Sequence, residues 1–166
     1  MPILKTGVFY WWIAFLSIAL DIATKLAVMT YVPFRGMIDI FPFLAITHVY
    51  NEGAAFSFLA DKSGWQGYFF IGVAAVASVA IITFLYKTPR TQKLLCVSLA
   101  LVLGGAIGNL IDRIAYGHVV DFILFYVRGV FTYPAFNIAD CAICIGVALL
   151  IIHSFFFDKD NKKERA

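Results

Sequence analysis

The stretch LLCVSLALVLGGAIGNLIDRI, residues 94–114, has no charged side chain before Asp112. An apolar helix needs about 20 residues to cross the hydrocarbon core of a bilayer, and this stretch is long enough. Its polar residues Asn109, Asp112 and Arg113 all lie near its C-terminal end. The stretch therefore predicts a transmembrane helix whose C-terminal end meets a polar environment.

The composition extends this interpretation to the whole chain. Of the 166 residues, 62% are hydrophobic and 14% are charged, whereas soluble domains are about half apolar and about a quarter charged. Three further apolar stretches, 8–30, 67–86 and 136–157, are also long enough to span a membrane. We expect an all-α integral membrane protein with four transmembrane helices in a single membrane domain, residues 1–166. A net charge of +3 is too small to indicate a nucleic-acid partner.

The distribution of Lys and Arg predicts the orientation of these spans. Three such residues lie in the short loop 87–93, and four lie in the tail 158–166. Positively charged residues accumulate on the cytoplasmic side of a membrane protein. We therefore expect this loop and both termini to be cytoplasmic, and the segments 31–66 and 115–135 to lie outside.

The two outer segments have sequences that are typical of regular structure. RGMIDIFPFLAITHVYN (35–51) and HVVDFILFYVRGVFTY (118–133) are rich in β-branched and aromatic residues, which favour strands. GAAFSFLADKSG (53–64) has the pattern of a short helix that lies along a membrane surface. The sequence thus predicts short outer strands and an interfacial helix.

This orientation brings many polar residues to one depth, close to the outer membrane interface. They come from three of the spans and from both outer segments. Ionisable residues inside a span are costly and usually face the bundle interior or a wet cavity. Several at one level therefore predict a functional site. The residues are Asp21, Lys25, Asn51, Asn109, Asp112, Arg113, Asp121, Asn137 and Asp140.

Each of the supporting residues also has a structural interpretation. Asp21 and Lys25 are four residues apart and share a helix face, so they either form a structural ion pair or contact a substrate. Asn109 and Asp112 either hold the ends of neighbouring helices together or touch a ligand. Arg113 either extends to the outer headgroups or binds substrate.

Asp121 and Asp140 lie in apolar surroundings at a matching depth. Two carboxyl groups held close together cannot both ionise easily, so the pair shares a proton. Such a pair activates water with one carboxylate and donates a proton to a carbonyl oxygen with the other. The alternative is a small ion- or proton-coupled transporter with an acidic outer site.

Four motifs, in order along the chain, closely resemble those of the lipoprotein signal peptidases, also called signal peptidase II. They are DIATK (21–25), NEGAAF (51–56), GNLIDRIAYGHVVDF (108–122) and PAFNIAD (134–140). The four-span layout agrees as well, so the resemblance covers essentially the whole chain. One departure is Ile22, where that family usually has Gln.

The resemblance implies an intramembrane aspartyl endopeptidase with Asp121 and Asp140 as its catalytic dyad, and with no cofactor or metal. Its substrates would be diacylglyceryl-modified prolipoproteins, cut just before the lipidated cysteine. Supporting or substrate-binding roles are implied for Asp21, Lys25, Asn51, Gly53, Asn109, Asp112, Arg113 and Asn137.

The resemblance also implies a fold and a location. The fold would be a four-helix membrane bundle with a small extracytoplasmic β-cradle and a short interfacial helix. The protein would lie in the bacterial cytoplasmic (inner) membrane, in contact with membrane lipid, and we expect it to be a monomer.

Overall fold

The computed structural model describes residues 2–53 and 65–156. Within these residues, four helices are long and apolar enough to cross a membrane, which confirms the predicted four apolar helices. They are α1 (Trp11–Tyr31), α2 (Trp65–Lys87), α3 (Lys93–Tyr116) and α4 (Ile138–Phe156). Two short 3₁₀ turns, η1 (Ile3–Lys5) and η2 (Gly7–Tyr10), precede α1. The helix predicted over 53–64 falls, apart from Gly53, outside the described residues, as does the tail 158–166.

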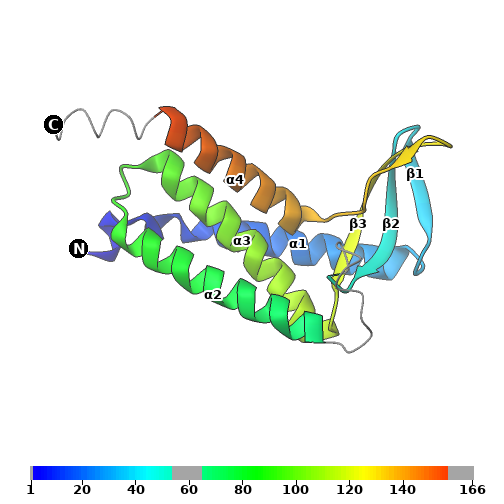
Figure 1. The fold of residues 1–166 in the computed structure, drawn as a ribbon, viewed down its shortest axis with the longest axis horizontal. Coiled ribbons are helices and arrows are strands. Elements are labelled where there is room, and N and C mark those ends of the chain that lie inside the picture. Colours follow the sequence, from blue (N-terminus) through cyan, green and yellow to red (C-terminus); the bar gives the residue numbers. More distant parts are fainter. Residues whose placement is uncertain (1, 54–64, 157–166) are drawn as a thin grey trace.

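Helix α3 lies at the centre of the bundle and packs against the other three helices (Figure 1). Glycines permit the close approaches. A Cβ on Gly104 would lie 2.8 Å from the Ala14 carbonyl oxygen of α1. A Cβ on Gly105 would overlap the Ala139 carbonyl oxygen at the start of α4. Small residues let helix backbones meet in a membrane, where apolar burial gives no preference for the protein interior.

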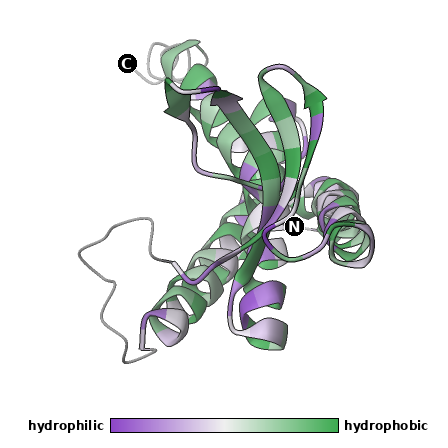
Figure 2. Cartoon of the chain, turned by 90° about the vertical axis from the view of Figure 1, so that its right-hand side faces the viewer, coloured by the Kyte–Doolittle hydropathy of each residue, from purple (hydrophilic) through white to green (hydrophobic). Residues whose placement is uncertain are grey.

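The outer surfaces of the helices are apolar. Val76 on α2 and Phe155 on α4 are strongly exposed, together with most of their apolar neighbours. Hydrophobic colour predominates on the helices, with hydrophilic segments among it (Figure 2). So large an exposed apolar area requires lipid around it.

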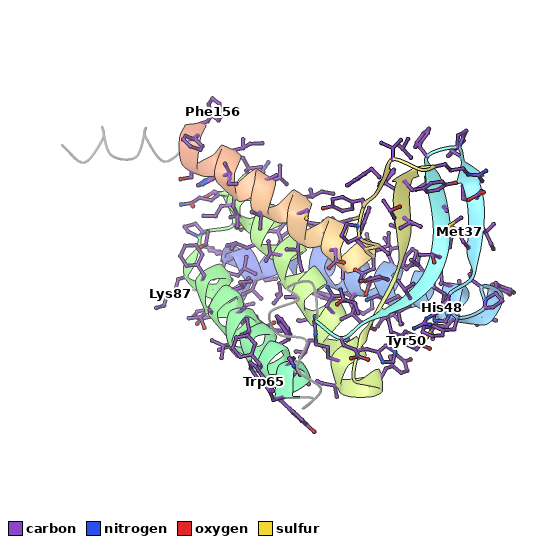
Figure 3. All side chains as sticks on the ribbon, turned by 45° about the vertical axis from the view of Figure 1, so that its right-hand side comes forward. Met37, His48, Tyr50, Trp65, Lys87 and Phe156 are labelled. Atoms are coloured by element: carbon purple, nitrogen blue, oxygen red, sulfur yellow. The ribbon has the colours of Figure 1, made fainter. Side chains whose placement is uncertain are left out.

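The two outer segments form a small antiparallel sheet with the order β1-β2-β3-β4. Its strands are β1 (Met37–Phe41), β2 (Leu44–Asn51), β3 (Val119–Val127) and β4 (Phe131–Thr132), so the strands predicted in both outer segments are present. The sheet lies at one end of the bundle, and the described ends of the chain lie at the other (Figure 1). Figure 3 shows the same separation, because Met37, His48 and Tyr50 lie far from Lys87 and Phe156.

One irregularity in β2 determines which side chains share a face with β3. Ile46 pairs with Ile123, but Val49 pairs with Asp121, so β2 has one more residue than β3 between these pairs. This is the geometry of a β-bulge. Directly opposed residues in an antiparallel pair point to the same face, so Val49, Asn51 and Asp121 lie on one face of the sheet.

The sheet is joined to the bundle by apolar packing and by main-chain hydrogen bonds. Phe122 of β3 packs with Val28 and Val32 at the end of α1, and all three are buried. The amides of Phe122 and Ile123 both donate to the carbonyl of Phe136, just before α4. These contacts fix β3 beside the first turn of α4, where the two candidate catalytic aspartates lie.

Candidate active site

The position of Asp140 is set by the start of α4. Asn137 directly precedes this helix, and its Oδ1 accepts a hydrogen bond of 2.9 Å from the Asp140 amide. In return, Asp140 Oδ2 accepts one of 3.3 Å from the Asn137 amide. This reciprocal pair is a capping box, here made by Asn and Asp. The helix N-terminus favours the negative charge of Asp140, which lies in its first turn.

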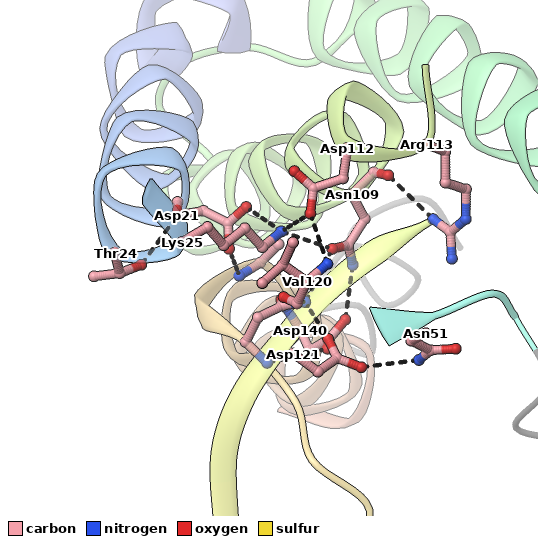
Figure 4. Close-up of polar contacts among 12 residues, drawn as sticks. Asp21, Thr24, Lys25, Asn51, Asn109, Asp112, Arg113, Val120, Asp121 and Asp140 are labelled. Carbon is pink, nitrogen blue, oxygen red and sulfur yellow. Dashed lines mark hydrogen bonds and ion pairs between the residues drawn. The ribbon is translucent and has the colours of Figure 1, made fainter. Parts of the chain in front are cut away.

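The same Asn137 side chain joins Asp140 to Asp121. Its Nδ2 donates to Asp121 Oδ1 at 2.7 Å. The other oxygen of Asp121 accepts a hydrogen bond of 2.9 Å from Asn51 Nδ2, at the end of β2 (Figure 4). Asn137 therefore contacts both aspartates of the predicted dyad, although they come from a strand and a helix 19 residues apart in sequence.

A third asparagine completes the contacts of Asp140. Asn109 of α3 donates from Nδ2 to Asp140 Oδ1 at 2.7 Å. Its Oδ1 accepts from Asn137 Nδ2 at 3.2 Å and from Lys25 Nζ at 3.2 Å. Each carboxyl group of the dyad is therefore held by two side-chain or main-chain N–H donors, which fix its orientation before any substrate arrives.

Behind the dyad lies a buried ion network. Lys25 Nζ is 2.6 Å from Asp21 Oδ2 and 2.8 Å from Asp112 Oδ2, and none of the three residues is more than 3% exposed. Asp21 Oδ1 accepts from the Ala139 amide at 2.8 Å, and Asp112 Oδ2 accepts from the Val120 amide at 3.1 Å. The network thus holds the two backbone segments that directly precede Asp140 and Asp121. Of the two interpretations of Asp21 and Lys25, the structure shows the ion pair.

Burial raises the pKa of Asp121 from 3.8 to about 6. The nearby charge of Asp140 also raises this pKa, while the hydrogen bonds from Asn51 and Asn137 and the charge of Lys25 lower it. The desolvation cost outweighs these stabilising contacts because the side chain is almost fully covered. Asp121 therefore exchanges its proton near neutral pH, which is what a group that alternates between acid and base requires.

Arg113 and Gly53 lie at the edge of the site. Arg113 Nη1 donates to the Asn109 carbonyl at 3.2 Å, and its buried Nε has no hydrogen-bond partner within residues 2–53 and 65–156. Gly53 has a φ of 91°, a conformation that suits glycine, and its amide donates to Asn51 Oδ1 at 2.9 Å. Each of these two residues therefore forms a hydrogen bond with an asparagine that in turn donates to an aspartate of the dyad.

A cavity of about 340 Å³ opens beside Asp121. Asn51 and Asp121 are the predicted site residues in its lining, whereas sequence reasoning missed the other lining residues. Their position next to Asn51, or shortly before Asn137, is the only signal that could have indicated them. The lining residues are Val49, Tyr50, Asn51, Glu52, Asp121, Pro134 and Ala135. Over residues 2–53 and 65–156, no three His, Cys, Asp or Glu side chains are grouped in a way that could hold a metal ion.

Comparison with known proteins identifies the family. The family model for signal peptidase (SPase) II matches residues 13–156. The chain belongs to the signal peptidase II family. It is 49% identical to the lipoprotein signal peptidase of Histophilus somni, over 99% of this chain and 98% of that protein. It is 47% identical to the lipoprotein signal peptidase of Yersinia enterocolitica, over 93% of this chain and 90% of that one.

A solved structure described as a bacterial membrane enzyme has the same fold. It superposes with a TM-score of 0.80 and 34% identity, covering 96% of both chains. Membership of the signal peptidase II family makes this chain a protease of the bacterial inner membrane. These comparisons give no support to the alternative of a small coupled transporter.

Proposed function

We propose that this signal peptidase II removes signal peptides from diacylglyceryl-modified prolipoproteins and cuts just before the lipidated cysteine. We further propose that it is an aspartic endopeptidase in which Asp121 and Asp140 form the catalytic dyad. The observation that supports the dyad most directly is the Asn137 side chain, which contacts both aspartates. The family and the lipoprotein signal peptidases that the chain resembles support the choice of substrate.

The proposed chemistry needs one proton on the pair of carboxyl groups. The ionised carboxyl takes a proton from a water molecule, whose oxygen attacks the scissile carbonyl carbon. The protonated carboxyl donates its proton to the carbonyl oxygen, which gives a tetrahedral diol. One carboxyl then gives its proton to the departing nitrogen, while the other takes a proton from a hydroxyl of the diol as the C–N bond breaks. The products are an amine and a carboxylic acid, the pair again holds one proton, and no side chain forms a covalent bond with the substrate.

Three asparagines are proposed to position the dyad. Asn51, Asn109 and Asn137 donate hydrogen bonds to its oxygens, and such donors favour the ionised form of one carboxyl. The proposed role of the buried network of Asp21, Lys25 and Asp112 is to hold the backbone on either side. Arg113 and Gly53 are proposed to act at the substrate side, because Arg113 Nε is a buried donor without a partner among the described residues.

The substrate is proposed to reach the site from the lipid. An extended peptide segment would occupy the cavity beside Asp121. Its acyl chains would lie against exposed apolar helix surface, where each buried methylene contributes about 0.8 kcal/mol. Binding of this kind explains a requirement for lipidation without polar recognition of the glycerol.

The membrane arrangement is also part of the proposal. The positions of Lys and Arg support cytoplasmic termini and a cytoplasmic loop between α2 and α3. The four-stranded sheet would then be an extracytoplasmic cradle for the peptide, with an interfacial helix nearby. We propose that the enzyme works as a monomer, because all the residues of the proposed dyad and its donors come from one chain.

A cleavage assay with the purified protein in detergent tests this proposal. A diacylglyceryl-modified precursor peptide should be cut in the presence of a chelator, and the same peptide without the lipid should not. Asp121→Asn and Asp140→Asn should each lower the rate by about 10²- to 10⁴-fold, the usual contribution of a proton-transfer group. Asp39→Asn is the matched control, since Asp39 lies in β1 and pairs with Tyr126 and Arg128. Full activity in either dyad variant would exclude the aspartic mechanism.

A further inference from the structure

Phe70 of α2 contacts two of the predicted site residues, although nothing in its own sequence context indicates a role. The centre of its ring is 5.2 Å from the Arg113 guanidinium carbon. Its ring also covers Gly53, because a Cβ added at Gly53 would overlap Phe70 Cε2 and lie 2.7 Å from Cδ2. One ring therefore lies against a cation on one side and against a turn of the main chain on another.

Each of these contacts leads to a different aspartate. On the Gly53 side, the Gly53 amide donates to Asn51, and Asn51 donates to Asp121. On the Arg113 side, Arg113 donates to the carbonyl of Asn109, and the Asn109 side chain donates to Asp140. The charges of both aspartates act on Arg113 as well. Phe70 therefore contacts the first residue of each of these two series of hydrogen bonds, Gly53 in one and Arg113 in the other.

We propose that Phe70 is a positioning residue for peptide cleavage, which holds the Arg113 guanidinium and the turn 51–53 in fixed relation to the dyad. This inference rests on the proposed function. An aromatic face attracts a guanidinium and leaves the N–H groups at its edge free to donate. Within the part of the chain that the structure describes, Arg113 Nε is such a free donor, so the ring orients a donor that can still bind another group.

The contact also explains the requirement for glycine at position 53. The backbone there has a φ of 91°, and the space that a side chain would need is filled by the ring. Replacing Phe70 with Leu would remove the aromatic face and open this space, while the position would remain apolar. The turn 51–53 would then lose its packing partner, and the hydrogen bond from Asn51 to Asp121 would loosen.

The test compares Phe70→Leu with Phe84→Leu in the detergent cleavage assay. Phe84 is the matched control, because it is another phenylalanine of α2 and about half of its surface is exposed (52%). Phe69 is unsuitable, since its ring packs edge-to-face against Phe70 at 5.5 Å. We expect Phe70→Leu to lower kcat about tenfold and to change KM by less than about threefold. We expect Phe84→Leu to keep the wild-type kcat. Equal losses in both variants, or a wild-type kcat in Phe70→Leu, would overturn the inference.

Two further measurements separate positioning from a general loss of stability. The Asn51 hydrogen bond lowers the pKa of Asp121, so its loosening in Phe70→Leu should move the alkaline limb of the pH–rate profile to higher pH. Phe70→Leu should also have a smaller effect in an Arg113→Lys background, because only the contact of Phe70 with the turn 51–53 then remains to be lost. An unmoved alkaline limb together with a full tenfold effect in the Arg113→Lys background would mean that Phe70 acts only through stability.

The outcome for the dyad is independent of this result. If Asp121→Asn and Asp140→Asn are inactive while Phe70→Leu is normal, only the role of Phe70 is wrong. If either dyad variant retains full activity, the proposed mechanism itself is wrong.

Discussion

Three asparagines hold the two aspartates by hydrogen bonds. Asn51, Asn109 and Asn137 all donate to carboxylate oxygens, and donors of this kind stabilise the charged form. Burial opposes them at Asp121, and burial has the larger effect on its pKa. The balance leaves Asp121 with a pKa near 6, at which a change of one hydrogen bond alters the population of its two forms.

The pKa of Asp121 predicts how stability depends on pH. Its folded-state value of about 6 lies above the ordinary 3.8, so the folded protein binds the proton more tightly than the unfolded chain does. Stability from this group is fully present below about pH 4 and is lost as the pH rises through about 6. The increase in the pKa of Asp121 on folding corresponds to a loss of stability of about 3 kcal/mol. Asp121→Asn, which has no charge to bury, should escape this loss.

Thermal unfolding in detergent at several pH values measures the effect. The stability of Asp121→Asn relative to wild type should increase between about pH 4 and about pH 7 and then level off. Asp39→Asn, an exposed carboxylate in the same sheet, serves as the control and should follow the wild-type curve. Parallel curves for wild type and Asp121→Asn would show that Asp121 is not a buried, proton-binding group.

At the scale of elements, four segments meet at Lys25. The lysine comes from α1, and its partners hold α3, the start of β3 and the first turn of α4. A buried charge is tolerated only when it is paired and hydrogen-bonded. This network connects the helices to the strand that carries Asp121. We therefore expect it to contribute to the stability of the folded protein rather than to the cleavage reaction itself.

Lys25→Met should therefore destabilise the protein. Removing one partner of a buried ion network costs about 3–5 kcal/mol, because Asp21 and Asp112 would remain buried without a counter-ion. Thermal unfolding and the yield of folded protein measure this loss, and Lys93→Met at the exposed start of α3 is the control. A Lys25→Met protein with wild-type stability and no cleavage activity would instead make Lys25 part of the reaction.

Some of this arrangement can be predicted from the sequence, and some cannot. Hydropathy predicts the helices, and the positions of Asn109, Asp112 and Asp140 near helix ends predict a shared depth. The spacing Asn-x-x-Asp at 137–140 is itself a capping signal. No local pattern predicts that Asn137 also reaches Asp121, because that contact depends on how β3 is placed beside α4. Phe70 is hidden for a related reason, since one more phenylalanine in an apolar helix carries no signal.

At the scale of the whole molecule, the sheet and the described chain ends lie at opposite ends of the helices (Figure 1). Such polarity suits an enzyme that works at one face of the bilayer and has the basic loop with Lys87, Arg90 and Lys93 at the other. Orientation follows from charge and not from packing, because the apolar helices fit the bilayer in either direction.

Cysteine labelling tests this orientation. With the three native cysteines replaced by Ala, Val130→Cys in the turn between β3 and β4 should react with a membrane-impermeant maleimide in intact spheroplasts. Thr91→Cys, in the loop between α2 and α3, should react only after the membrane is opened. Both positions are exposed in the protein, so a difference in labelling reports the side of the membrane. The reverse pattern would invert the proposed orientation.

The additional residue in β2 also has a consequence for how the length of the hairpin formed by β1 and β2 can change. It determines which alternate side chains of β2 point to the face of the sheet that carries Asp121, so that Asn51 and not Tyr50 lies on that face. Deleting either Thr47 or His48 would exchange the two faces of β2 beyond that point and turn the Asn51 side-chain amide away from the Asp121 carboxyl. Insertions beyond Ile46, at the far turn, would leave this orientation unchanged. A change of length in the distal half therefore leaves Asn51 facing Asp121, whereas a change by one residue between Ile46 and Val49 does not.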